Sequence, residues 1–166
     1  MSGSSVDPSR VSAVALLTPG WPTLSNGIAT YALAIHDALA ELGVRTFLLA
    51  RTVQDPRTLP PDVVNVAWDA RRRSLPERLV DRALARFGAD RALAYEFVRS
   101  NLLALRRLHR ERGVQLFEME EGAGLAGRIA RRAPVPVVVR LHGPWFLNGV
   151  ARGVPQDEAY RRRDRL

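Results

Sequence analysis

The sequence contains no cysteine and no lysine, and only 7% of its 166 residues are aromatic. The lack of cysteine excludes a disulfide framework and any metal site built on thiolates, and it agrees with a reducing cytosol. No run of about 18 or more apolar residues occurs, so the sequence predicts no membrane-spanning helix. Residues 1–10 are polar and lack the apolar stretch of a secretory signal. We therefore expect a disordered leader and a cytoplasmic protein.

Without lysine, arginine carries all of the positive charge and gives the chain a formal net charge of +8. Codon bias in a GC-rich genome is one explanation. The other is an anionic partner, such as a membrane surface, nucleic acid or a phosphorylated substrate. The arginines cluster at 71–73, 106–112, 131–132 and 161–163, and the aromatic residues lie elsewhere. Because RNA-binding folds interleave such clusters with stacking aromatics, we expect no nucleic-acid partner.

The apolar residues, 46% of the chain, form strand and helix patterns in alternation. Short apolar runs predict strands at 11–17, 45–50, 63–68, 114–120 and 136–141. Helical spacing and capping residues predict helices at 27–42, from 74 onward, at 90–112 and at 123–132. This alternation is typical of an α/β fold, a Rossmann-like parallel sheet with helices on both faces. We expect one domain at 11–150, followed at 151–166 by a charged tail or the start of a truncated continuation.

The loop from Thr18 to Gly27 joins the end of the first strand to the first helix. Free amide groups and the helix dipole at such a point favour an anion, and Gly27 would let a ligand approach the backbone closely. Asn26 and Gly27 can equally be a simple turn and helix cap. Both interpretations stay open on these residues alone.

Gly122 to Gly127 match the pattern G-x-G-x-x-G between a predicted strand and a predicted helix. The motif follows the fourth strand rather than the first, and Glu118, Glu120 and Glu121 crowd its entrance, where they would repel a pyrophosphate. Arg140 could nevertheless suit a 2′-phosphate. An NADP-binding oxidoreductase fragment therefore remains an alternative function.

Polar side chains also gather at the ends of the last two predicted strands. Glu118 and Glu120 alternate along a strand and so share one face, where they could bind sugar hydroxyls, act as acid and base, or be a solvated strand end. His142 closes the fifth strand and would face the same crevice as Gly27, or be a satisfied structural histidine. No hydrolase triad is evident, and three scattered histidines do not predict a metal site.

Four segments in order carry a family resemblance. They are VALLTPG at 14–20, NGIATYALAIHDALAELG at 26–43, FEMEEGAGLAG at 117–127 and PVVVRLHGP at 136–144. Together they resemble the amino-terminal, acceptor-side domain of GT-B glycosyltransferases of the retaining family 4 type. The resemblance runs from about residue 11 to residue 149. The resemblance implies that the G-x-G-x-x-G pattern is a tight turn of small residues, and that its match to the dinucleotide fingerprint is a coincidence.

The resemblance implies transfer of a sugar from a nucleotide-diphosphate donor with retention of configuration, without a metal or a further cofactor. It implies a catalytic role for His142, which would reach the donor sugar. The residues implied to bind donor or acceptor are Asn26, Gly27, Glu118, Glu120, Arg140 and Gly143. Asn26 departs from the family pattern, which has a second glycine there.

The segments that hold the nucleotide in this family do not occur in the sequence. The implied partners are therefore a carboxy-terminal GT-B domain, in cis or in trans, a nucleotide sugar, and a sugar or lipid-linked acceptor. The net charge adds a possible peripheral contact with the inner face of the membrane. We expect the chain alone to be inactive. A non-catalytic module that pairs with a separate protein is the second alternative.

Overall fold

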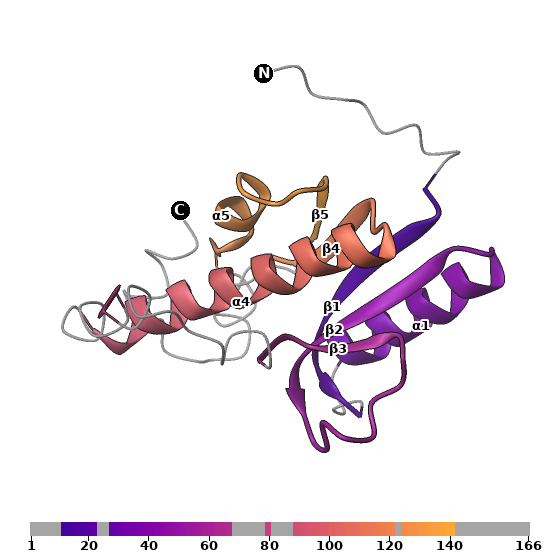
Figure 1. The fold of residues 1–166 in the computed structure, drawn as a ribbon, viewed down its shortest axis with the longest axis horizontal. Coiled ribbons are helices and arrows are strands. Elements are labelled where there is room, and N and C mark those ends of the chain that lie inside the picture. The colour runs from indigo at the N-terminus through magenta and orange to yellow at the C-terminus, as the bar shows by residue number, and fades with distance from the viewer. Residues whose placement is uncertain (1–10, 23–26, 68–78, 81–87, 122–123, 142–166) are drawn as a thin grey trace, which may run out of the picture.

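The computed structural model of this chain describes residues 11–22, 27–67, 79–80, 88–121 and 124–141. The described part contains one five-stranded sheet, in which every neighbouring pair of strands is parallel, with the order β3-β2-β1-β4-β5 (Figure 1). The strands are β1 (Ala13–Trp21), β2 (Arg45–Val53), β3 (Val63–Asn65), β4 (Leu116–Glu120) and β5 (Val137–Arg140). The sheet confirms the predicted Rossmann-like α/β fold.

The central strand β1 is almost fully buried, because it has neighbours on both edges and helices on both faces. Its register with β2 runs from Ala13 opposite Arg45 to Trp21 opposite Val53. The ladder to β4 is shorter and covers only Val14 to Leu16. The strand continues past the predicted end at 17 and through Pro19, which is tolerated where one edge of the strand is unpaired.

The helix α1 (Gly27–Glu41) covers one face of the sheet over β1 and β2 (Figure 1). Its buried Ala32 packs with side chains of even number on those strands, such as Leu16 and Leu48. The small alanine lets the helix approach the sheet closely. This cluster forms the smaller of the two cores.

Two helices, α4 (Ala89–Arg112) and α5 (Ala126–Ala130), cover the opposite face. Leu105 of α4 and Ile129 of α5 are fully buried together with Phe117 and Met119, the odd-numbered side chains of β4. Successive side chains on a strand point to opposite faces, so one apolar strand serves both cores. The predicted arrangement of helices on both faces is confirmed.

Glycines end the two long helices as predicted. Gly43 follows α1 with φ 77°, and Gly113 follows α4 with φ 69°. The Gly113 N–H donates to the carbonyl oxygen of His109 at 3.2 Å, which satisfies one of the last carbonyls of the helix. A residue with a Cβ would be strained in this left-handed conformation.

Several predicted elements are shorter in the structure, among them the fourth strand, which begins at Leu116 rather than at 114, and the fifth, which spans only Val137–Arg140. The third strand ends at Asn65 rather than at 68, because the Asn65 Oδ1 accepts a hydrogen bond from the N–H of Ala67 at 3.0 Å and turns the chain into a helical conformation. The helix predicted from 123 begins at Ala126 and ends at Ala130. The leader at 1–10, the predicted helix start at 74 and the tail at 151–166 lie outside the described residues.

Candidate functional site

The strand order identifies the edge of the sheet where a ligand is expected. From β1 the chain moves outward to β2 and β3, and then returns to the other side of β1 for β4 and β5. The direction of the crossovers therefore reverses between β1 and β4. In open α/β sheets, ligands bind at such a switch point, outside the carboxyl ends of the strands.

Glu118 and Arg140 form an ion pair beside this switch point. Glu118 lies opposite Leu16 of β1 in the register, which places it on the face of the sheet that carries α1. Arg140 lies two residues beyond Val138, the partner of Glu118 on β5, and so shares that face. The Arg140 Nη1 donates to the Glu118 Oε1 at 2.7 Å, and each side chain is only 15% exposed. A charge-assisted bond of this length holds both side chains in place.

Tyr31 completes the cluster from the helix side. The Cζ of Arg140 lies 3.7 Å from the centroid of the Tyr31 ring, so the guanidinium rests on the aromatic face. Arg140 is thereby held between a carboxylate of β4 and a ring of α1. We call these three residues, Tyr31, Glu118 and Arg140, the strand-end cluster.

Sequence reasoning did not single out Tyr31 and missed this contact. The signal that could have found it is its spacing from Gly27. Residues four apart share one face of a helix. A tyrosine one turn into the helix that follows β1 is therefore positioned at the carboxyl edge of the sheet.

Gly27 begins α1, and neither its backbone nor its packing requires a glycine. Its φ does not lie in the left-handed region, and a Cβ built on it would meet nothing within 4 Å. The positive end of the helix dipole at this point, one turn from Tyr31, favours a phosphate or a hydroxyl oxygen.

The structure brings part of the predicted set together. Glu118 and Arg140 are in contact, and Gly27 lies one helical turn from Tyr31. Glu120 is half-buried, lies opposite Arg140 in the register and has contacts of its own. The other predicted residues, Asn26, His142 and Gly143, lie outside the described residues.

The strand-end cluster is suited to hydrogen bonding with neutral polar groups rather than to holding a strong anion. Arg140 supplies N–H donors and Glu118 supplies carboxylate oxygens, in a fixed orientation. Their charges compensate each other at 2.7 Å. Hydroxyl groups, which both donate and accept, match such a pair.

The described part of the G-x-G-x-x-G segment does not favour a dinucleotide. Gly124 has φ 78°, so it makes a tight turn, and the helix α5 that follows has five residues. A Cβ on Gly127 would meet only the Arg131 Nη1 at 3.6 Å, an ordinary contact. Arg140, the candidate partner of a 2′-phosphate, is paired with Glu118 on the face of the sheet opposite α5.

The described ranges contain neither a candidate metal centre nor a candidate membrane-spanning helix. No group of three or more histidine, aspartate or glutamate side chains in them could hold a metal ion. No helix in these ranges combines the length and the apolar character needed to cross a bilayer. Comparison of the chain with protein-family models, with curated proteins and with solved structures gives no significant match.

Proposed function

We propose that this chain is the acceptor-side, Rossmann-like half of a retaining GT-B glycosyltransferase of the family 4 type. The observation that carries the proposal is the strand-end cluster, a fixed and charge-compensated set of donors and acceptors beside the switch point of the sheet. A sugar acceptor presents hydroxyl groups, which such a set binds.

The order of the family-like segments supports the same proposal. The segments at 14–20 and 26–43 contain most of β1 and all of α1, and those at 117–127 and 136–144 contain most of β4 and all of β5. Residues far apart in the sequence thus meet at one edge of the sheet, where Tyr31, Glu118 and Arg140 are in contact. A parallel sheet brings the carboxyl ends of all its strands to one edge, and the family-like segments supply the residues that are in contact there.

In the proposed reaction, Glu118 and Arg140 orient the acceptor, and the amino end of α1 at Gly27 contacts a phosphate or hydroxyl group. The bond between the anomeric carbon and the nucleotide diphosphate breaks, the acceptor hydroxyl oxygen forms a glycosidic bond of the same configuration, and the hydroxyl proton passes to the leaving diphosphate. His142 is proposed to reach the donor sugar, and Asn26 and Gly143 to line the same crevice. The proposed donor is a nucleotide-diphosphate sugar, without a metal or another cofactor.

The proposal requires a second domain. A leaving diphosphate needs preorganised positive groups, and we propose that a carboxy-terminal GT-B domain supplies them, in cis or in trans. The isolated chain is then expected to show no sugar transfer from UDP-glucose or GDP-mannose. We place the protein in the cytoplasm, with a sugar or lipid-linked acceptor at the inner face of the membrane.

A nuclear magnetic resonance titration of the chain with neutral sugars tests the acceptor role. Octyl β-glucoside, octyl α-mannoside and myo-inositol serve as probes, because each presents several hydroxyl groups without charge. We expect saturable shifts of the amide signals at 27–31, 118–121 and 140 with at least one of them. Glu118→Gln should abolish these shifts, whereas Glu41→Gln, at the exposed end of α1, should leave them unchanged.

Two results would contradict the proposal. The first is the absence of any shift at the strand-end cluster with all three probes. The second is saturable binding of NADPH with shifts at 124–130, which would favour the oxidoreductase alternative. A thermal melt of Glu118→Gln, followed by circular dichroism, verifies that the variant is folded before its binding is compared.

A further inference from the structure

A groove runs between α4 and α5 on the face of the sheet opposite the strand-end cluster. It encloses about 430 Å³, within the range of roughly 300–1,000 Å³ that is usual for small-molecule sites. Ten residues line it, and they come from one stripe of α4, from Arg128 of α5 and from Arg132 in the turn after α5.

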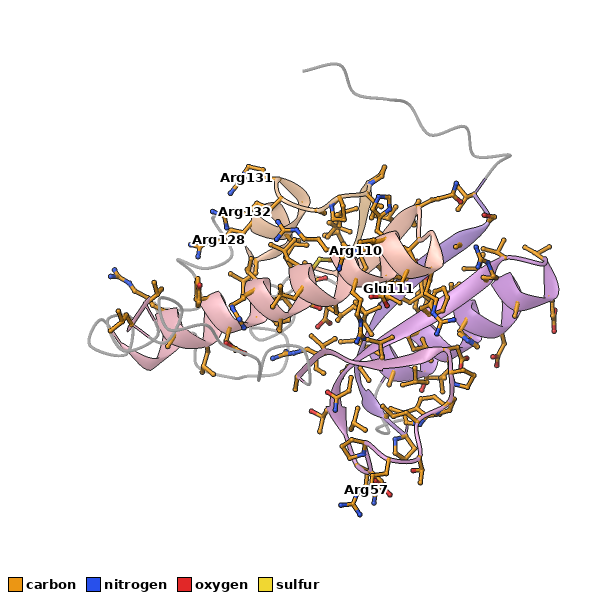
Figure 2. The ribbon with its side chains drawn as sticks, viewed as in Figure 1. Arg57, Arg110, Glu111, Arg128, Arg131 and Arg132 are labelled. Carbon is orange, nitrogen blue, oxygen red and sulfur yellow. The ribbon has the colours of Figure 1, made fainter. Side chains whose placement is uncertain are left out.

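The rim of the groove is strongly basic. Five of the ten lining residues are arginines, and no aspartate or glutamate is among them. Arg128 of α5 and Arg132, in the turn that follows α5, are exposed and project outward (Figure 2). The Arg106 Nη2 donates to the carbonyl oxygen of Arg132 at 3.4 Å, which links α4 to the turn after α5. Planar guanidinium groups on both sides are suited to a phosphate or a carboxylate.

The floor of the groove is apolar. Val98 and Leu102 are buried beneath it, and Tyr95 and Leu103 are half-buried along its length. These side chains recur at helical spacing, so they form a continuous strip of α4 between the arginines. An inorganic anion would contact the rim and leave this strip unused. A ligand with an apolar body and an anionic group would contact both.

We propose that this groove binds a single phosphate-bearing amphiphile. Its phosphate lies among the guanidinium groups of Arg106, Arg128 and Arg132, and its apolar body lies on Val98, Leu102 and Tyr95. The assignment goes beyond the proposed glycosyltransferase function, because it concerns the other face of the sheet and uses none of the residues of the strand-end cluster.

A second hollow in the described part of the chain has a different character. It encloses about 400 Å³ between β3 and the carboxyl half of α4, and Glu111 lies in its lining with Arg107 and Arg112. Its lining carries charges of both signs, together with three prolines, so it has no clear preference for an anion. Nucleic acid fits the α4–α5 groove poorly, because Tyr95 is its only aromatic lining residue and single strands are held by several stacked bases.

Short-chain lipids that stay monomeric in solution test the proposal. The probe is dihexanoyl phosphatidic acid below its micelle concentration, titrated into the full chain and followed by the amide signals at 91–106 and 126–132. We expect saturable shifts in both ranges. Dihexanoyl phosphatidylcholine, whose headgroup carries no net charge, should bind roughly tenfold more weakly or not at all.

Matched charge variants locate the site. Arg128→Gln with Arg132→Gln should weaken binding of the phosphatidic acid by roughly tenfold or more. Arg57→Gln with Arg112→Gln removes the same charge outside the groove and should change binding by less than about twofold. Figure 2 shows Arg57 at the opposite end of the molecule from α5. Circular dichroism melts of both double variants verify that they are folded.

Several outcomes would overturn the proposal. One is the absence of binding to the unaltered chain. Another is equal weakening in the two double variants, which would indicate a general charge effect. If inorganic pyrophosphate binds as tightly as the phosphatidic acid, the apolar floor contributes nothing to binding. Binding to phosphatidylglycerol vesicles without binding to the monomeric lipid would indicate adsorption to a membrane surface instead of a ligand in the groove.

Discussion

At the scale of single residues, the pairing of Glu118 with Arg140 is the ion pair with the largest expected effect on stability. Arg140→Met would leave the Glu118 carboxylate 15% exposed and without the 2.7 Å hydrogen bond from Nη1. We expect a loss of roughly 3 kcal/mol in the free energy of unfolding, measured by urea denaturation. Combining it with Glu118→Leu removes the buried charge and should restore most of that loss. A double variant less stable than the single one would contradict this explanation.

The second prediction at this scale concerns His36, which joins α1 to the segment before β3. Its Nε2 lies 2.8 Å from the Asp62 Oδ2, and its Nδ1 lies 2.9 Å from the Asp37 Oδ1. Asp37 is 74% exposed and Asp62 only 37%. Asp62→Ala should therefore cost about 1 kcal/mol of unfolding free energy and Asp37→Ala close to none. Urea denaturation of the two variants measures both losses. Equal losses of unfolding free energy would contradict the prediction.

The sequence could predict which residues lie at the strand ends, but not which of them touch. Alternation along a strand predicts the shared face of Glu118 and Glu120. The contact of Glu118 with Arg140 depends on the register between β4 and β5, which no local pattern determines. Tyr31 looks like a core residue in sequence, because its ring is apolar. Its role emerges only when β5 brings a guanidinium to that ring.

At the scale of helices and strands, the two long helices were predictable because glycines end them. Gly43 and Gly113 adopt the left-handed conformation that interrupts a helix. The short elements were predicted less well. The third strand ends early at the Asn65 side chain. The residues at 123–132 form a helix of only five residues, since the turn at Gly124 comes first. Local hydrogen bonds and turns set such boundaries, and hydrophobic periodicity does not predict them.

Two glycines at helix ends provide a contrasting pair of substitutions. Gly113→Ala should lower the free energy of unfolding by about 1 kcal/mol, because φ is 69° and a Cβ is strained there. Gly27→Ala should cost nothing or stabilise by up to about 1 kcal/mol, because its φ is ordinary and the space around a Cβ is open. Urea denaturation measures both.

The two glycine substitutions should have the opposite order of effects on sugar binding, with Gly27→Ala the more damaging one. A Cβ at Gly27 would occupy the open space above the amino end of α1, so we expect Gly27→Ala to weaken the sugar-induced shifts. Gly113 lies at the far end of α4, and its alanine variant should keep them. If Gly27→Ala binds sugars like the unaltered chain, the amino end of α1 is not part of the acceptor site.

At the scale of the whole molecule, the alternation of elements predicted the fold class but not the order of the strands. Sequence patterns give strands and helices in chain order, and several parallel sheets satisfy the same alternation. The order β3-β2-β1-β4-β5 comes from long-range packing. It is this order that creates the switch point between β1 and β4, and hence the meeting of residues from the first and last thirds of the described chain.

The two cores share the strands of one sheet, so we expect the described domain to unfold as a unit. Even-numbered side chains of β1 pack under α1 and odd-numbered ones under α4. Leu105→Ala, in the α4 core at 0% exposure, should cost about 2–5 kcal/mol. Leu93→Ala, at 68% exposure on the same helix, should cost almost nothing and serves as the control.

The cooperativity is tested by amide hydrogen exchange. Because neither core can exist without β1, Leu105→Ala should lower the protection of α1 amides by the same free energy as that of α4 amides, although α1 lies on the other face of the sheet. The urea transition followed by circular dichroism should remain single, with an unchanged slope. Protection of α1 that survives the substitution would mean that each face of the sheet is an independent folding unit, and that the strands hold together without the larger core.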